Sequence, residues 1–74
     1  MATNEELQAI NAKITSELVK CTLKQEGYLS LFKAACFERN GELAAQYRQE
    51  LEANMSIMLD HHASVMTNIA MMRY

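Results

Sequence analysis

The residues best suited to metal chemistry are Asp60, His61 and His62, which are consecutive in the chain. Adjacent side chains on a helix point about 100° apart, so these two histidines cannot readily ligate one ion together. Helical metal sites place histidines at i and i+4, as in the HExxH motif, and the sequence lacks that spacing. We therefore expect no metal site and no cofactor.

One alternative uses the methionines near His62. Met55, Met58 and Met66 recur around it at helical spacing, and thioether ligands select Cu(I). The simpler interpretation places His62 in an apolar seam, hydrogen-bonded to water or a partner, with methionine as an adaptable filler. Metal analysis of the native protein would separate the two interpretations.

Cys21 and Cys36 are the candidate nucleophiles. Activation of a thiol requires a nearby base or cation, and the histidines are the available bases near Cys21. A seam between two helices offers no oxyanion hole, so both cysteines are interpreted as small core residues. The sequence also lacks a glycine-rich phosphate loop, a Ser/His/Asp set and a dinucleotide-binding fingerprint. We predict no enzymatic activity and no catalytic residues.

The same cysteines bear on the cellular compartment. On one helix they would lie about 22 Å apart, too far for a disulfide within the chain, which favours a reducing compartment. The N-terminus is polar and acidic, and no apolar run approaches the ~18 residues of a membrane span. We expect a cytoplasmic protein without membrane insertion.

The charge balance argues against nucleic acid as a partner. Seven basic and nine acidic residues give a formal net charge of −2. Nucleic-acid binders concentrate basic residues on one face, whereas here they are scattered among acids. The 74 residues suffice for one domain at most.

Helical periodicity organises the second half of the chain. From Glu42 to Tyr74 there is no proline or glycine, and apolar residues advance by steps of three and four. We expect one side of a long helix, residues 42 to 73, to carry Tyr47, Leu51, Met55, Met58, His62, Val65, Ile69 and Met72.

The first half predicts a second helix, residues 4 to 38. Thr3 and Glu6 match a capping box at its start. Its apolar side comprises Leu7, Ile10, Ile14, Leu18, Cys21, Tyr28, Phe32 and Ala35. Gly27 lies in its interior, where glycine costs about 1 kcal/mol relative to alanine, so a kink or a break remains open there.

Arg39, Asn40 and Gly41 form the strongest turn signal. Gly41 suits the position just past a helix end, and Asn40 could instead cap the following helix. A short connection favours two antiparallel helices. The expected fold is all-α: one domain, residues 1 to 74, forming an antiparallel helical hairpin that completes a helical bundle with itself or with a partner.

A hairpin turning at Arg39 and Asn40 sets a register. Apolar layers then pair Leu7 with Met72, Ile14 with Val65, Cys21 with Met58, Tyr28 with Leu51 and Ala35 with Ala44. Between them, Gln25 faces Asn54 and Asn11 faces Asn68. We expect these two polar layers to fix the register, as a buried asparagine does in coiled coils.

Two helices alone leave apolar side chains uncovered. The second helix has an apolar flank beyond its seam, and the first has another stripe on its far side. Exposed stripes of that size mark an interaction surface. We predict that the partner-binding residues are Leu23, Phe37, Met55, Leu59 and Met66.

The segment from Asn40 to Glu52, with a glycine in the turn and a Gln-Tyr pair opening an amphipathic helix, resembles small helical-hairpin proteins of type III secretion systems. The similarity is to the short co-chaperones of the needle subunit, and it covers about a third of the chain. Needle subunits themselves carry a proline-containing turn, and this chain has no proline. The resemblance implies a cytoplasmic hairpin that packs on a helical-repeat chaperone and helps keep the needle subunit unpolymerised.

We therefore expect a non-enzymatic protein-binding module that works as an oligomer or a heterocomplex. Two alternatives stay open. One is a homodimeric four-helix bundle acting as a scaffold. The other is a small phage-encoded inhibitor of a host protein complex, which the size and the acidic charge permit.

Overall fold

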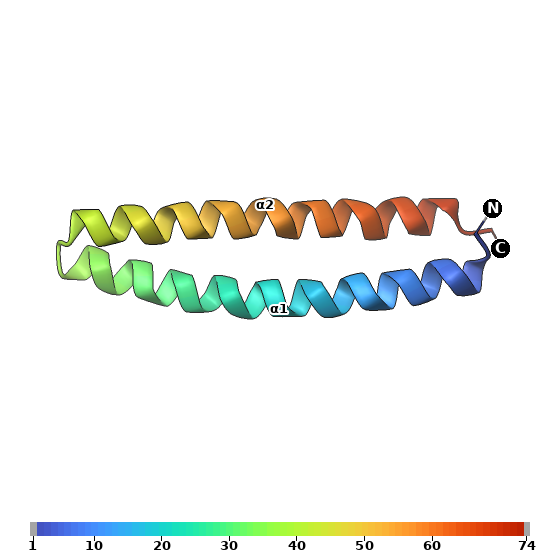
Figure 1. Cartoon of the computed structure of the whole chain (residues 1–74), viewed down its shortest axis with the longest axis horizontal. Helices are drawn as coiled ribbons and strands as arrows, with labels where there is room; N and C mark the ends of the chain where they lie inside the picture. Colours follow the sequence, from blue (N-terminus) through green and yellow to red (C-terminus); the bar gives the residue numbers. More distant parts are fainter. Residues whose placement is uncertain (1, 74) are drawn as a thin grey trace.

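The computed structural model describes residues 2–73, which form two long antiparallel helices joined by a tight turn (Figure 1). Helix α1 spans Asn4–Phe37 and helix α2 spans Gly41–Met71. The pair forms a rod with Cα extents of 54 × 14 × 14 Å, and both chain ends lie at the end opposite the turn. The predicted all-α hairpin is confirmed.

Helix α1 begins where the sequence predicts. Thr3 has an extended backbone, and its hydroxyl oxygen accepts a hydrogen bond from the Glu6 backbone N–H at 3.1 Å. Glu5 and Glu6 place negative charge in the first turn, where the helix dipole favours it. The helix then continues without interruption through Gly27. The break left open at this glycine does not occur.

The turn is a Schellman motif followed directly by a capped helix. The backbone N–H of Arg39 donates to the Cys36 carbonyl at 3.1 Å, and that of Asn40 donates to the Ala35 carbonyl at 2.9 Å. Arg39 takes the left-handed conformation with φ of 57°. The Asn40 side chain caps α2 by accepting from the Leu43 backbone N–H at 3.1 Å.

This arrangement decides between the two interpretations of the turn. Asn40 is the N-cap, and Gly41 is the first residue of α2. The expectation of a glycine just past the first helix is wrong, because the left-handed position falls on Arg39.

Burial along both helices repeats every seven residues. The buried or half-buried positions of α1 are Asn4, Leu7, Asn11, Ile14, Leu18, Cys21, Gln25, Tyr28, Phe32 and Ala35. Those of α2, continued by the capping residue Met72, are Leu43, Ala44, Tyr47, Leu51, Asn54, Met58, His61, Val65, Asn68 and Met72. Apart from Leu43, each series advances by strict alternation of three and four, the spacing that keeps two long helices in contact.

The register is confirmed by its two polar layers. Asn54 Nδ2 donates to Gln25 Oε1 at 2.8 Å, and Asn68 Nδ2 donates to Asn11 Oδ1 at 2.9 Å. Asn54 is buried, with 5% of its surface exposed.

The composition of the predicted seam is wrong at four positions. Met55, His62 and Ile69 are exposed, and the seam next to them is occupied by His61 and by Asn54 and Asn68, the asparagines of the two predicted polar layers. On α1, Ile10 is likewise exposed. The prediction followed apolar residues and not the strict seven-residue repeat. On α2 it therefore chose residues one position after the true seam residues.

Candidate protein-binding surfaces

Each helix has two flanks beside its seam. In every seven residues, two positions belong to the seam. One flank of the helix lies beside the first of these two positions, and the other flank lies beside the second. A hollow beside the turn is lined by Cys36 of α1 and Arg48 of α2 among others, which shows that these two flanks lie on the same side of the rod. Counting by sevens from Cys36 and Arg48, and adding the residues three before and four after each counted position, which lie on the same side of the helix, gives the members of one face. The flanking residues on the other side of each seam form the second face.

One of these faces carries no charged side chain between Glu5 and Glu26 of α1 or between Glu52 and the end of α2 at Met71. We refer to it as the uncharged face, and all of its members are exposed. It consists of Gln8, Ala12, Thr15, Val19, Thr22, Met55, Leu59, His62, Met66 and Ile69.

The other side of the same section, here the charged face, differs in chemistry. Lys20 and Glu17 form an exposed ion pair on it at 3.2 Å. It consists of Glu6, Ile10, Lys13, Glu17, Lys20, Lys24, Ala53, Ile57, Asp60, Ser64, Thr67 and Met71. The hairpin therefore has one side with charged groups, which are costly to remove from water, and one side without them. The uncharged face is the less costly of the two to bury against another protein.

The five predicted partner-binding residues are all exposed, but they form two groups. Met55, Leu59 and Met66 lie together on the uncharged face of α2. Leu23 and Phe37 lie on α1 directly opposite the seam, about 21 Å apart along the helix. Phe37 is the most exposed large apolar residue among those described, at 92%.

Sequence reasoning missed the exposed position of Ile69 on the uncharged face, because it had assigned this residue to the seam. It also missed Ile57 and Met71, which are exposed on the charged face. The signal that identifies all three is the strict seven-residue count, since each falls one position away from a seam residue.

The uncharged face contains a hollow of about 380 Å³ lined by Leu18, Met55, Met58, Leu59 and His62. Its walls are almost entirely apolar side chains, with the imidazole of His62 as the polar group. Two thioethers and one imidazole of the Cu(I) alternative thus border a common space. Among residues 2–73, no group of three or more His, Cys, Asp or Glu side chains is placed to hold a metal ion.

The two cysteines are separate free thiols. Cys21 is half-buried in the seam and Cys36 is exposed beside the turn. Cys21 lies beneath Asn54, whose Nδ2 donates to the Cys21 carbonyl oxygen at 2.8 Å. The prediction of a small core residue is therefore wrong for Cys36, which is exposed.

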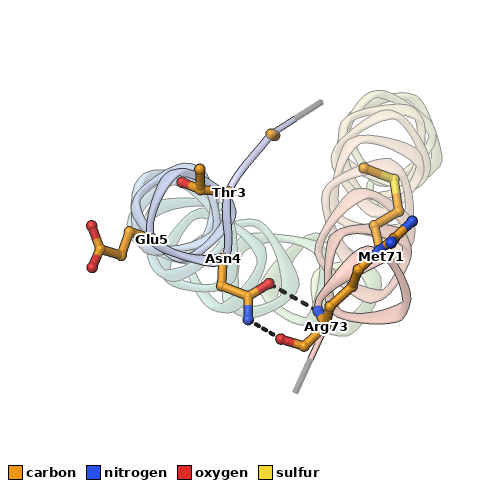
Figure 2. A pocket seen from close by; sticks show the side chains of 6 residues that line it. Thr3, Asn4, Glu5, Met71 and Arg73 are labelled. Carbon is orange, nitrogen blue, oxygen red and sulfur yellow. Dashed lines mark hydrogen bonds between the residues drawn. The ribbon is translucent and has the colours of Figure 1, made fainter.

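The open end of the rod is closed by a polar clasp (Figure 2). The backbone N–H of Arg73 donates to Asn4 Oδ1 at 2.9 Å, and Asn4 Nδ2 donates back to the Arg73 carbonyl oxygen. A hollow of about 510 Å³ lies beside this clasp, and Glu5 points away from α2. The clasp ties the segment that follows α2 to the first turn of α1, and its groups are engaged with each other.

Neither helix in the described part of the chain combines the length and the apolarity needed to cross a membrane. No protein-family model, no curated protein and no solved structure matches the chain.

Proposed function

We propose that this chain is a non-enzymatic protein-binding module whose partner is helical. The resemblance of its turn and early α2 to needle co-chaperones of type III secretion systems gives the proposal its concrete form. In that form the hairpin packs on a helical-repeat chaperone and contributes to holding the needle subunit unpolymerised in the cytoplasm.

The observation that carries the proposal is the shortage of buried apolar surface. Among the described residues, only Leu7 and Ala35 are buried hydrophobic residues. Twelve large apolar side chains are exposed, from Leu29 at 41% to Phe37 at 92%. Covering them against another protein removes apolar surface from water at roughly 25 cal/mol per Å².

A helical partner is favoured by the layout of these side chains. Met55, Leu59, Met66 and Ile69 follow one another along α2 at steps of four, seven and three residues. This spacing presents a straight apolar ridge, the form in which one helix packs into the groove between two others. The two methionines of this ridge, Met55 and Met66, have flexible side chains that adapt to an uneven partner surface.

The test is co-expression of the tagged chain with the helical-repeat chaperone and needle subunit of a type III secretion system. We expect the three proteins to elute together on size exclusion. Leu23→Asp and Met66→Asp should each weaken the complex at least about tenfold, since each places a charge in an apolar contact. Thr67→Asp is the matched control, because it adds the same charge one residue from Met66 on the charged face.

Two results would count against the proposal. Absence of any complex with the unmodified chain would remove the co-chaperone role. Equal binding by Leu23→Asp, Met66→Asp and Thr67→Asp would show that the exposed apolar residues are not the binding surface. Circular dichroism of each variant establishes that the helices are intact.

A further inference from the structure

The uncharged face has a shape as well as a composition. Its α2 half is built from long side chains, Met55, Leu59, Met66 and Ile69, together with His62. Its α1 half is built from the shorter Ala12, Thr15, Val19 and Thr22, with the longer Gln8 only at the end away from the turn. The face therefore consists of a ridge along α2 and a shallower trough along α1.

Ridge and trough are in step along the rod. The register that joins Gln25 to Asn54 and Asn11 to Asn68 sets Val19 level with Leu59, and Ala12 level with Met66. Suppose that a second copy of the chain lies against the uncharged face, related to the first by a two-fold axis that runs between the copies and parallel to the rod. This axis sets α1 of each copy against α2 of the other and leaves the height of every residue along the rod unchanged. Such an axis brings the ridge of each copy onto the trough of the other.

We propose that the uncharged face is the contact surface of a homodimer, in which α2 of each copy packs on α1 of the other. Val19 then lies against Leu59 of the second copy, and Ala12 against Met66 of the second copy. The result is a four-helix bundle in which helices in contact run antiparallel. This inference rests on the proposed function: it makes a second copy of the chain the helical partner of the uncharged face, and it leaves Leu23 and Phe37, which are exposed on the far side of α1, for another protein.

The area is sufficient for a specific dimer. The section of α2 between Glu52 and Met71 is about 28 Å long, and two adjacent helices are about 20 Å wide. Each copy therefore contributes roughly 500–600 Å², and the total exceeds the ~1,000 Å² required of a specific interface. No charged group within that section has to be dehydrated.

The alternative two-fold axis, perpendicular to the rod, is disfavoured by the same side chains. It would set α2 against α2, so that Met and Leu side chains meet each other while the trough residues of the two α1 helices leave a gap. Close packing requires large side chains to fill spaces between small ones. The proposed axis sets Glu26 level with Glu52 of the second copy, so this like-charged pair borders the contact at the end nearer the turn.

Sedimentation equilibrium of the purified chain alone tests the proposal. We expect a dimer whose dissociation constant rises at least tenfold in Leu59→Asp. The matched control is Ile57→Asp, which places the same charge at a comparably exposed residue of the charged face, 49% against 63%, and should change the constant less than about twofold.

The arrangement is tested by oxidative cross-linking in a background with Cys21→Ser and Cys36→Ser. Chains carrying Ala12→Cys mixed with chains carrying Met66→Cys should form a disulfide-linked pair, because the proposed axis sets these positions together. The mixture of Ala12→Cys and Val19→Cys chains should not. The reverse pattern would overturn the proposed packing.

The outcomes separate this inference from the proposed function. A chain that stays monomeric at high concentration overturns the homodimer. If that monomer still captures the helical-repeat chaperone through Met66, the binding function stands. A dimer that Leu59→Asp and Ile57→Asp weaken equally also overturns the inference, because the contact then lies elsewhere.

Discussion

Asn54 donates hydrogen bonds to the side-chain oxygen of Gln25 and to the backbone carbonyl of Cys21, both at 2.8 Å, from the middle of the seam. It is the only buried polar residue among those described. A one-residue slip of either helix would break this contact and would also move every seam residue off its partner. The asparagine therefore specifies which residues of α1 and α2 lie opposite each other.

Replacing Asn54 tests this role. We expect Asn54→Leu to lower the free energy of unfolding by about 1–3 kcal/mol, because Gln25 is left in the seam without its partner. Urea denaturation at fixed protein concentration measures the change.

The double variant Gln25→Leu/Asn54→Leu should recover most of that loss, since two apolar groups then face each other. Equal stability of Asn54→Leu and the double variant would contradict the coupling of these two residues.

Gly27 offers a substitution expected to stabilise the fold. A Cβ added there meets no atom within 4 Å, and the residue is exposed inside a continuous helix. Gly27→Ala should raise the free energy of unfolding by about 0.5–1 kcal/mol, because glycine loses more backbone entropy in a helix. A higher thermal midpoint with unchanged helicity would verify this, and a lower one would show that the glycine is needed for a contact.

Arg39 occupies a backbone conformation that favours glycine. Its φ of 57° lies in the left-handed region, which costs a residue with a Cβ about 1–2 kcal/mol. We expect Arg39→Gly to stabilise the chain by about 0.5–1 kcal/mol and Arg39→Val to destabilise it, since a branched Cβ fits this region worst. Urea midpoints of the two variants should fall on opposite sides of the unmodified chain.

Leu7 and Ile10 are neighbours on α1 with opposite surroundings. Leu7 is 3% exposed against Met72, whereas Ile10 is 46% exposed on the charged face. Leu7→Ala should cost about 2–4 kcal/mol and Ile10→Ala less than about 1 kcal/mol, because only Leu7 leaves a cavity. Guanidinium unfolding compares the two, and similar losses would contradict the assignment of Leu7 to the seam.

The hairpin and its register could be predicted from the sequence because Asn40 and Gly41 mark a single short turn between two segments with helical periodicity. The position of that turn decides which residues of the two helices lie opposite each other. Gln25 opposite Asn54 and Asn11 opposite Asn68 followed from that connection alone. The same reasoning placed His62 in the seam and was wrong, because it followed apolarity where the strict repeat demands His61. The exposed positions of Leu59 and Met66 were predicted correctly, whereas Met55 was assigned both to the seam and to the binding surface and is exposed. The role of all three in binding is a proposal.

The position of the left-handed residue could not be predicted from residue preference. Gly41 suits that conformation better than Arg39, yet Asn40 must be one residue before α2 to cap it. The preference of glycine for the left-handed position competes with the preference of asparagine for the N-cap of α2. The N-cap is formed by Asn40, which places the left-handed conformation on Arg39. The side-chain sizes that shape the uncharged face are visible in the sequence, but their alignment across two helices emerges only from the paired register.

The polar contacts across the hairpin join residues at very different separations along the chain. Gln25 and Asn54 are 29 residues apart in the chain, Asn11 and Asn68 are 57 apart, and Asn4 and Arg73 are 69 apart. The entropy lost on closing a loop grows with its length, so a contact nearer the turn forms at lower cost once the turn exists. We therefore expect the contacts to form in order from Asn40 outward, so that the clasp between Asn4 and Arg73 is the last contact to close and the first to open.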